Sequence, residues 1–362
     1  MTPALSLYLD ALRFGAAFTV LVSHYAAGRY SGGLFWQVMP YGRIAVLVFF
    51  VLSGFVIAWV TETRESSLED YGLSRVARLY SVIVPAFIVT AALDQIAMAI
   101  DPRLYGPQWA QGPAHTLLGF MLSAVFLGAS WTLSAQPGSN VPYWSLNYEA
   151  WYYVLFAGAA FLRGRRRITA IAGAALLAGP KILLLFPLWL MGVGAWRWRT
   201  AVRPELGVPL AFAAVAGFII LQALGGRRLF GQPGTPWVPP FFSCHDYVVG
   251  ALVALLIIGL ANARLLMPGA AIQRLIRLLA GTSFGLYLLH YPLLNFLGTV
   301  IPGPADRTLH RILVFGLTLG GSIGLAHLIE RQKGILKHTL RSGLDMVRGR
   351  RPPSAVHRQG LR

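Results

Sequence analysis

The sequence predicts an all-α polytopic membrane protein with about ten transmembrane helices and no soluble domain. Hydrophobic residues make up 56% of the 362 residues and charged residues only 12%, roughly half the charged fraction of a soluble domain. The mean hydropathy is +0.60. Stretches such as 44–60 and 247–263 contain no charged side chain, and about 20 apolar residues suffice for a helix to cross a membrane.

Eleven apolar segments follow one another along the chain. They are 5–26, 43–61, 76–98, 114–133, 146–162, 167–180, 182–196, 207–224, 246–263, 280–301 and 308–329. If all eleven cross the membrane, the amino terminus lies outside. If 114–133 is instead re-entrant or interfacial, ten segments cross and both termini lie inside. The numbers of Lys and Arg in the loops do not separate these topologies. We favour ten crossings because an anion-binding role for Arg75 and Arg78 requires the cytosolic side.

The formal net charge of +18 does not indicate nucleic-acid binding, because Lys and Arg gather in the cytoplasmic loops of polytopic proteins. Here the basic clusters 163–167 and 197–203 fall in alternate loops, on the side predicted for the basic carboxyl-terminal tail. We therefore expect a transmembrane domain over residues 1–331. Residues 332–362 are expected to form a disordered cytoplasmic tail, because no apolar face long enough to pack is evident there.

The first apolar segment carries the most informative polar residues. Arg13 and His24 are eleven residues apart, which is about three helical turns, so they share one face and lie roughly 16 Å apart along the axis. Asp10 lies near the same stripe. Inserting an ionisable group into membrane hydrocarbon costs about 2.5–3.5 kcal/mol of free energy, so these ionisable residues on one helix face predict a functional site. The alternative for His24 is a structural hydrogen bond to a backbone carbonyl.

Glu149 begins a later apolar helix among aromatic residues. One interpretation is an interfacial helix start, where an acid suits the helix dipole. The other is a carboxylate turned into the bundle. With ten crossings, Glu149 and His24 lie at similar depth on the outer side, so we expect them to pair. A carboxylate that orients an imidazole lets the imidazole abstract a hydroxyl proton.

Arg75 and Arg78 share a face at the start of another helix, because they are three residues apart. Guanidinium groups at a membrane border can simply anchor the helix. The sharper hypothesis is a phosphate site for a cytosolic ligand, since Arg binds phosphate oxygens in a bidentate way. Arg13 would extend this basic path into the membrane.

Three further patterns favour structural roles. Ser53 and Gly54 interrupt a bulky apolar run, which indicates close helix packing or, alternatively, the approach of a slim ligand. His290 shares a helix face with Ser283 and Tyr287, and it lies just before a proline that frees carbonyl groups to accept hydrogen bonds. Residues 244–246, a Cys-His-Asp run, chelate one metal ion poorly because they are adjacent, and we expect no metal.

Six segments in order resemble acyltransferase family 3, the integral-membrane acyltransferases of cell-envelope and exported carbohydrates. They are LDALRFGAAFTVLVSHY, FFVLSGFVIAW, SRVARLYSVIVP, YWSLNYEAWYYVLF, FPLWLMGVGAW and TSFGLYLLHYPLL. The resemblance runs over residues 5–331. One departure is that the last apolar segment ends in IERQKG, where we expected a proline soon after Glu330.

This resemblance implies an O-acyltransferase of the bacterial inner membrane. Acetyl-CoA would dock from the cytosol with its phosphates near Arg75 and Arg78, and no metal is needed. Arg13 and His24 would serve the transfer site, with Glu149 supporting His24. The acceptor would be a hydroxyl group of a carbohydrate or glycolipid on the outer side. His24 would either deprotonate that hydroxyl or carry the acyl group itself.

Two other functions compete with this one. A proton-coupled transporter could use intramembrane ionisable groups as a relay, namely Asp10, Arg13, His24, Asp94 and Glu149. Many transporters consist of two related halves that carry broken helices at matching positions. The sequence shows no such symmetry. A function as a membrane scaffold or sensor would not explain the ionisable residues of the first apolar segment. The acceptor sugar, the acyl group and the oligomeric state stay open.

Overall fold

Helices make up the architecture throughout the parts of the chain that the computed structural model describes, residues 1–101, 113–226, 242–330 and 333–347, where no strand occurs. The predicted all-α fold class is confirmed. Each of the eleven apolar segments contains a helix, although the segment 114–133 is helical only up to Ala124. The helices that correspond to them are α1 (Pro3–Tyr25), α3 (Tyr41–Thr63), α4 (Leu68–Ile100), α5 (Pro113–Ala124), α6 (Trp144–Phe161), α7 (Gly164–Ala178), α8 (Pro180–Trp198), α9 (Gly207–Ala223), α11 (His245–Asn262), α12 (Ala270–Val300) and α13 (Thr308–Glu330).

Six of the helices in the described ranges are each long and apolar enough to cross a membrane. They are α1, α3, α4, α9, α11 and α13, and the bent pair α7 and α8 adds a seventh if it counts as one span. α6 and α12 are long enough but less apolar, because they carry polar groups such as Asn147 and His290. Ten crossings therefore remain a prediction. α5, at 12 residues, rises only about 18 Å, less than the roughly 30 Å of membrane hydrocarbon.

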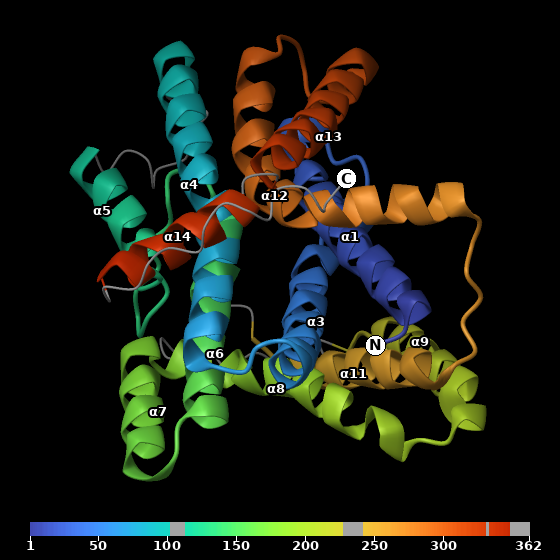
Figure 1. The fold of residues 1–362 in the computed structure, drawn as a ribbon. Coiled ribbons are helices and arrows are strands. Elements are labelled where there is room, and N and C mark those ends of the chain that lie inside the picture. Colours follow the sequence, from blue (N-terminus) through green and yellow to red (C-terminus); the bar gives the residue numbers. More distant parts are fainter. Residues whose placement is uncertain (102–112, 227–241, 331–332, 348–362) are drawn as a thin grey trace.

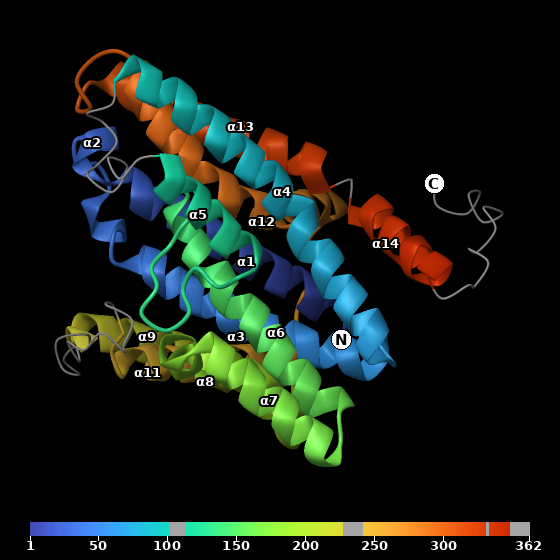
Figure 2. The same cartoon turned by 90° about the vertical axis from the view of Figure 1, so that its left-hand side faces the viewer.

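Helices such as α4, α6 and α13 run between two ends of the molecule, whereas the first part of α12 lies across them (Figures 1 and 2). In Figure 2 the amino terminus, the α3–α4 connection, the α6–α7 connection and α14 lie toward one end. The short helix α2 (Gly28–Ser31) and the α12–α13 connection lie toward the other. The basic cluster 163–167 belongs to the first end, which we call the inner end. This arrangement agrees with the even number of crossings in the ten-helix topology.

Glycines bring α3 and α8 into backbone contact. A methyl group at Gly54 would clash with the carbonyl oxygen of Trp189, and one at Gly192 would clash with the carbonyl oxygen of Val51. Only a residue without a side chain fits at either position. The predicted close helix packing at Gly54 is confirmed, and it fixes one wall of the site.

A buried ion pair joins α3 to α11. Both terminal nitrogens of Arg43 donate to the carboxylate of Asp246, which is fully buried. The same carboxylate accepts from the backbone N–H of Ser243 at 3.2 Å. Asp246 is thus occupied in tying two helices together, and no group of three or more His, Cys, Asp or Glu in the described ranges could hold a metal ion.

The prediction of a disordered tail is wrong for residues 333–347, which form helix α14 (Lys333–Val347). This helix packs against α4 near its start. Lys337 Nζ donates to Ser74 Oγ at 2.8 Å, and Arg341 pairs with Asp70 at 3.5 Å. The spacing of Leu336 and Leu340, four residues apart, gives α14 an apolar stripe that composition alone conceals. Residues 348–362 of the predicted tail lie outside the described residues.

The two ends of the bundle can be assigned to membrane sides by thiol labelling. In a Cys244→Ser background, Ser66→Cys should be protected from an impermeant reagent added outside intact cells, whereas Ser134→Cys should react. Ser66 precedes α4 at the inner end, Ser134 lies in the connection before α6, and both are exposed. Labelling of residue 66 from outside would overturn the assignment of Arg75 and Arg78 to the cytosolic side.

Candidate active site

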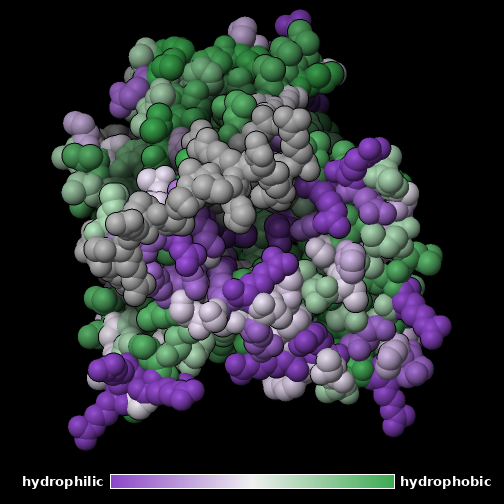
Figure 3. Space-filling view, viewed as in Figure 1, coloured by the Kyte–Doolittle hydropathy of each residue, from purple (hydrophilic) through white to green (hydrophobic). Residues whose placement is uncertain are grey.

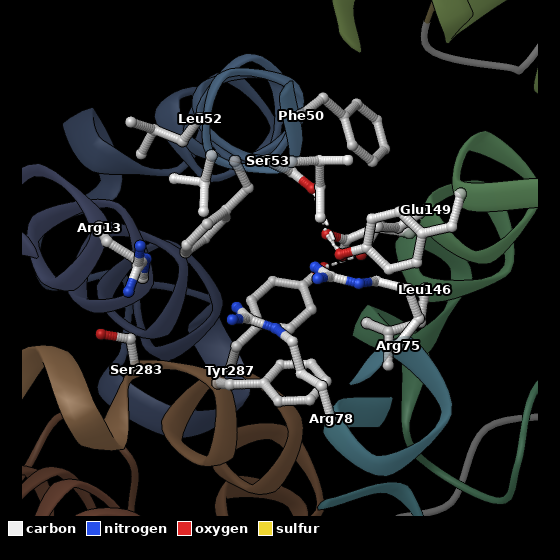
Figure 4. Close-up of a pocket in the computed structure, with 16 residues that line it drawn as sticks. Arg13, Phe50, Leu52, Ser53, Arg75, Arg78, Leu146, Glu149, Ser283 and Tyr287 are labelled. Carbon is white, nitrogen blue, oxygen red and sulfur yellow. Dashed lines mark hydrogen bonds between the residues drawn. The ribbon is translucent and has the colours of Figure 1, made fainter. Parts of the chain in front are cut away.

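Five helices, α1, α3, α4, α6 and α12, enclose a pocket with about 700 Å³ of empty space, part of it open to solvent. The face of the molecule seen in Figure 3 gathers hydrophilic side chains and is hollowed near its centre. Figure 4 shows the side chains that line the pocket. The charged ones are Arg13, Arg75, Arg78 and Glu149. The structure thus brings together residues from distant parts of the sequence.

The three arginines approach the pocket from two sides (Figure 4). Arg13 comes from α1 and pairs with Asp10 at 3.4 Å. Arg75 comes from α4, lies 2.5 Å from the carboxylate of Glu65 and is 90% buried. The guanidinium group of Arg78, one turn further along α4, makes no hydrogen bond or ion pair with the residues that the structure describes. All three arginines therefore line one pocket, with the carboxylates of Asp10 and Glu65 paired to Arg13 and Arg75.

Glu149 does not pair with His24, contrary to our prediction. Its carboxylate accepts hydrogen bonds from Ser53 Oγ at 2.6 Å and from the Tyr153 hydroxyl. Trp189 Nε1 donates to the same serine oxygen at 3.2 Å. These contacts fix the carboxylate in the pocket wall, on the side of Arg75 (Figure 4).

The connection that precedes α6 explains this correction. Ser139 and Asn140 are buried, and Asn140 Nδ2 donates to the carbonyl oxygen of Leu288 at 2.8 Å. Because this connection is folded into the bundle, α6 begins below the outer surface rather than at it. Glu149 consequently lies deeper than His24, at the level of the arginines.

His24 pairs with His290 instead. His24 Nδ1 and His290 Nε2 are 2.9 Å apart, and the two rings stack with centroids 5.2 Å apart. The ring of Tyr291 lies edge-on to His24, with centroids 4.8 Å apart. His290 is fully buried. We predicted a backbone hydrogen bond for His290, and His290 Nδ1 does lie 3.0 Å from the carbonyl oxygen of Leu286.

This chain of contacts assigns the protons of both rings. A carbonyl oxygen only accepts, so His290 Nδ1 carries a hydrogen and donates to Leu286. His290 Nε2 is then the acceptor for the Nδ1–H of His24. The remaining nitrogen of His24, Nε2, therefore holds a lone pair. The hydrogen bond to His290 thus fixes the tautomer and the orientation of the His24 ring.

The histidine pair lies one helical turn beyond the pocket. Tyr287 lines the pocket, and its ring centroid is 6.2 Å from that of His290, three residues later on α12. The Tyr287 hydroxyl donates to the carbonyl oxygen of Pro142 and contacts Ser145, both at 2.8 Å. Ser283 also lines the pocket. The predicted stripe of Ser283, Tyr287 and His290 thus leads from the arginines to His24.

Sequence reasoning missed several partners. Tyr153 follows Glu149 by four residues, so helical spacing could have predicted their contact. Two other contacts join separate segments of the chain: Ser53 with Glu149, and Glu65 with Arg75. No local sequence pattern predicts either of them. His290 carried a signal, since it shares a face with two residues of the pocket.

The chain matches known proteins along most of its length. A family model described as an acyltransferase domain covers residues 6–327. Acyltransferase MdmB of Streptomyces mycarofaciens is 28% identical over 96% of this chain and 94% of its own length. Exopolysaccharide production protein ExoZ of Rhizobium meliloti (strain 1021) is 27% identical over 69% of this chain and 75% of its own length. No solved structure matches significantly.

Proposed function

Because the chain belongs to acyltransferase family 3 and is a multi-pass membrane O-acyltransferase, we propose that it takes an acyl group from cytosolic acyl-CoA. It transfers this group to a hydroxyl of an envelope or exported carbohydrate at the opposite end of the bundle. Acetyl is the acyl group that we propose. The bacterial inner membrane is the corresponding location, since acyl-CoA lies on its cytosolic side and envelope glycans are finished on the other.

The pocket that gathers three arginines and ends at Tyr287, one helical turn before the histidine pair, carries this proposal. Coenzyme A has a charged nucleotide end and a thin, uncharged arm that ends in the thioester. Arg75 and Arg78 lie on the inner part of α4, where their guanidinium groups can bind phosphate oxygens. Phe49 and Leu52 give the pocket apolar walls suited to the arm. The thioester would then reach the turn of α12 that holds Tyr287 and His290.

The proposed chemistry is direct transfer with His24 as the general base. The lone pair on His24 Nε2 takes the proton of the acceptor hydroxyl, whose oxygen attacks the thioester carbonyl. The carbon–oxygen bond forms and the carbon–sulfur bond breaks. The proton then passes from His24 to the departing thiolate, which leaves as coenzyme A. His290 keeps His24 in the required tautomer.

A carbohydrate acceptor is supported by the relatives. The name of ExoZ links it to exopolysaccharide production, and MdmB is named an acyltransferase. Mass spectrometry of the envelope polysaccharide from a deletion strain and its complemented counterpart tests this part. A loss of O-acyl groups that the gene restores is the expected result. Identical polysaccharides would refute the proposed acceptor class.

Replacing both Arg75 and Arg78 with lysine should raise the apparent KM for acyl-CoA at least tenfold. An ammonium group does not reproduce the bidentate contact of a guanidinium with phosphate, and each lost charge-assisted hydrogen bond is worth about 1.5–3 kcal/mol. The maximal rate should fall less, because these groups hold the nucleotide end far from the reacting carbonyl. Donor titrations in isolated membranes measure both quantities.

The matched control is Arg165→Lys with Arg166→Lys, since both residues are exposed at the inner end and neither lines the pocket. This control should leave the titration unchanged. Superimposable curves for the Arg75 and Arg78 variant and the wild type would assign these arginines to helix anchoring and withdraw the donor site.

A further inference from the structure

A polar cluster adjoins the histidine pair at the outer end of the bundle. Its centre is Arg29 on α2, whose Nη2 donates to Asn295 Oδ1 at 2.6 Å and to the Tyr291 hydroxyl at 3.2 Å. The guanidinium lies over the ring of Tyr30, 4.4 Å from its centroid. The Tyr30 hydroxyl also donates to Asn295. These contacts hold an exposed arginine side chain in one position.

The guanidinium of Arg29 is held but not neutralised. Both hydrogen bonds leave from Nη2, whereas a guanidinium has five N–H donors. Nε and Nη1 make no hydrogen bond with the described residues, and no described carboxylate lies within ion-pair distance of Arg29. Its partners are two phenols and an amide, all uncharged. Such a group is arranged to bind an oxyanion that comes from outside the chain.

Tyr291 connects this cluster to the transfer site. Its hydroxyl accepts from Arg29 and its ring lies against His24. An anionic group bound to Arg29 would therefore sit beside the imidazole, on the side of the bundle opposite the donor arginines. We propose, as an extension of the proposed function, that Arg29 with Tyr291 and Asn295 forms an acceptor subsite for an oxyanion of the carbohydrate substrate.

Two sources can supply this oxyanion. One is the carboxylate of an acidic sugar, and the other is the phosphate that links a sugar to a lipid carrier. Binding of three small probes separates them: methyl β-D-glucuronide, glucose 1-phosphate and the neutral methyl β-D-glucoside. The protein is the full chain in lipid nanodiscs, with Arg75→Gln and Arg78→Gln, so that anions cannot bind at the donor site.

We expect at least one charged probe to bind at least tenfold more tightly than the neutral glucoside. Tighter binding of the glucuronide alone would identify a site for a carboxylate. Tighter binding of glucose 1-phosphate alone would identify a site for a phosphate, and tighter binding of both would identify a general oxyanion site. Adding Arg29→Gln should abolish the preference. The matched control, Arg307→Gln, removes another exposed arginine of the outer end and should retain it. Unchanged size-exclusion elution and thermal unfolding would show that the Arg29 variant is folded.

Equal binding of charged and neutral probes, no binding of any probe, or a preference that survives Arg29→Gln would each overturn the subsite. None of these results bears on the proposed transfer from acyl-CoA, which is tested separately. That proposal would be refuted if protein with Arg75 and Arg78 intact showed no acylation that depends on added acyl-CoA.

Discussion

Replacing His24 with alanine is expected to lower the rate of acyl transfer by about 10²–10⁴-fold, the usual contribution of a general base. The amount of protein in the membrane should not change, because the imidazole contributes one hydrogen bond, to His290, and no ion pair within the described part of the chain. The rate is measured with radiolabelled acyl-CoA in isolated membranes, at equal amounts of inserted protein. Full activity of this variant would rule out the proposed chemistry.

Variants of His290 supply the control for orientation. His290→Ala removes the acceptor for the Nδ1–H of His24, so the rate should fall, but less than in the His24 variant. His290→Gln offers an amide oxygen that can accept the same hydrogen bond and should retain more activity than His290→Ala. If the two His290 variants are equally active, the hydrogen bond to His24 does not contribute to the rate.

Removing the carboxylate of Asp246 is expected to destabilise the protein by about 3–5 kcal/mol, because Asp246→Ala leaves the guanidinium of Arg43 without its counter-ion in the interior. Asp246 is fully buried, and the side chain of Arg43 is only 16% exposed. The pair joins α3, which carries Ser53 of the pocket, to α11. Unfolding in a detergent titration measures the free-energy change.

The double variant Arg43→Met with Asp246→Leu is the matched control. Replacing both members of a buried ion pair with apolar residues of similar volume is often neutral or stabilising. The double variant should therefore be more stable than Asp246→Ala alone. If it is equally unstable, the loss arises from packing around α11 rather than from the unpaired charge.

The sequence predicts the arginine side of the site well. Arg75 and Arg78 share a face because helical spacing dictates it, and the depth of Arg13 follows from its place on the first helix. These inferences need only the geometry of single helices. The structure accordingly gathers all three residues around one pocket.

The histidine side depends on tertiary structure that spacing does not encode. The depth of Glu149 is set by the buried connection before α6, in which Asn140 binds the backbone of α12. His290 meets His24 because α12 packs against α1, a pairing between residues far apart in the sequence. Composition likewise concealed α14, since its basic residues mask an apolar stripe with helical period.

The glycine contact between α3 and α8 bears on how an acyl group can pass through the bundle. Because Gly54 and Gly192 each meet backbone of the opposite helix, sliding of one helix along the other would drive side chains into that contact. α8 therefore holds α3 in a fixed position, and α3 gives the pocket a rigid wall. We expect the range of acyl chains that the proposed donor site accepts to be set by the volume of the side chains on that wall, such as Phe49, Leu52 and Val56, and to change when they are replaced.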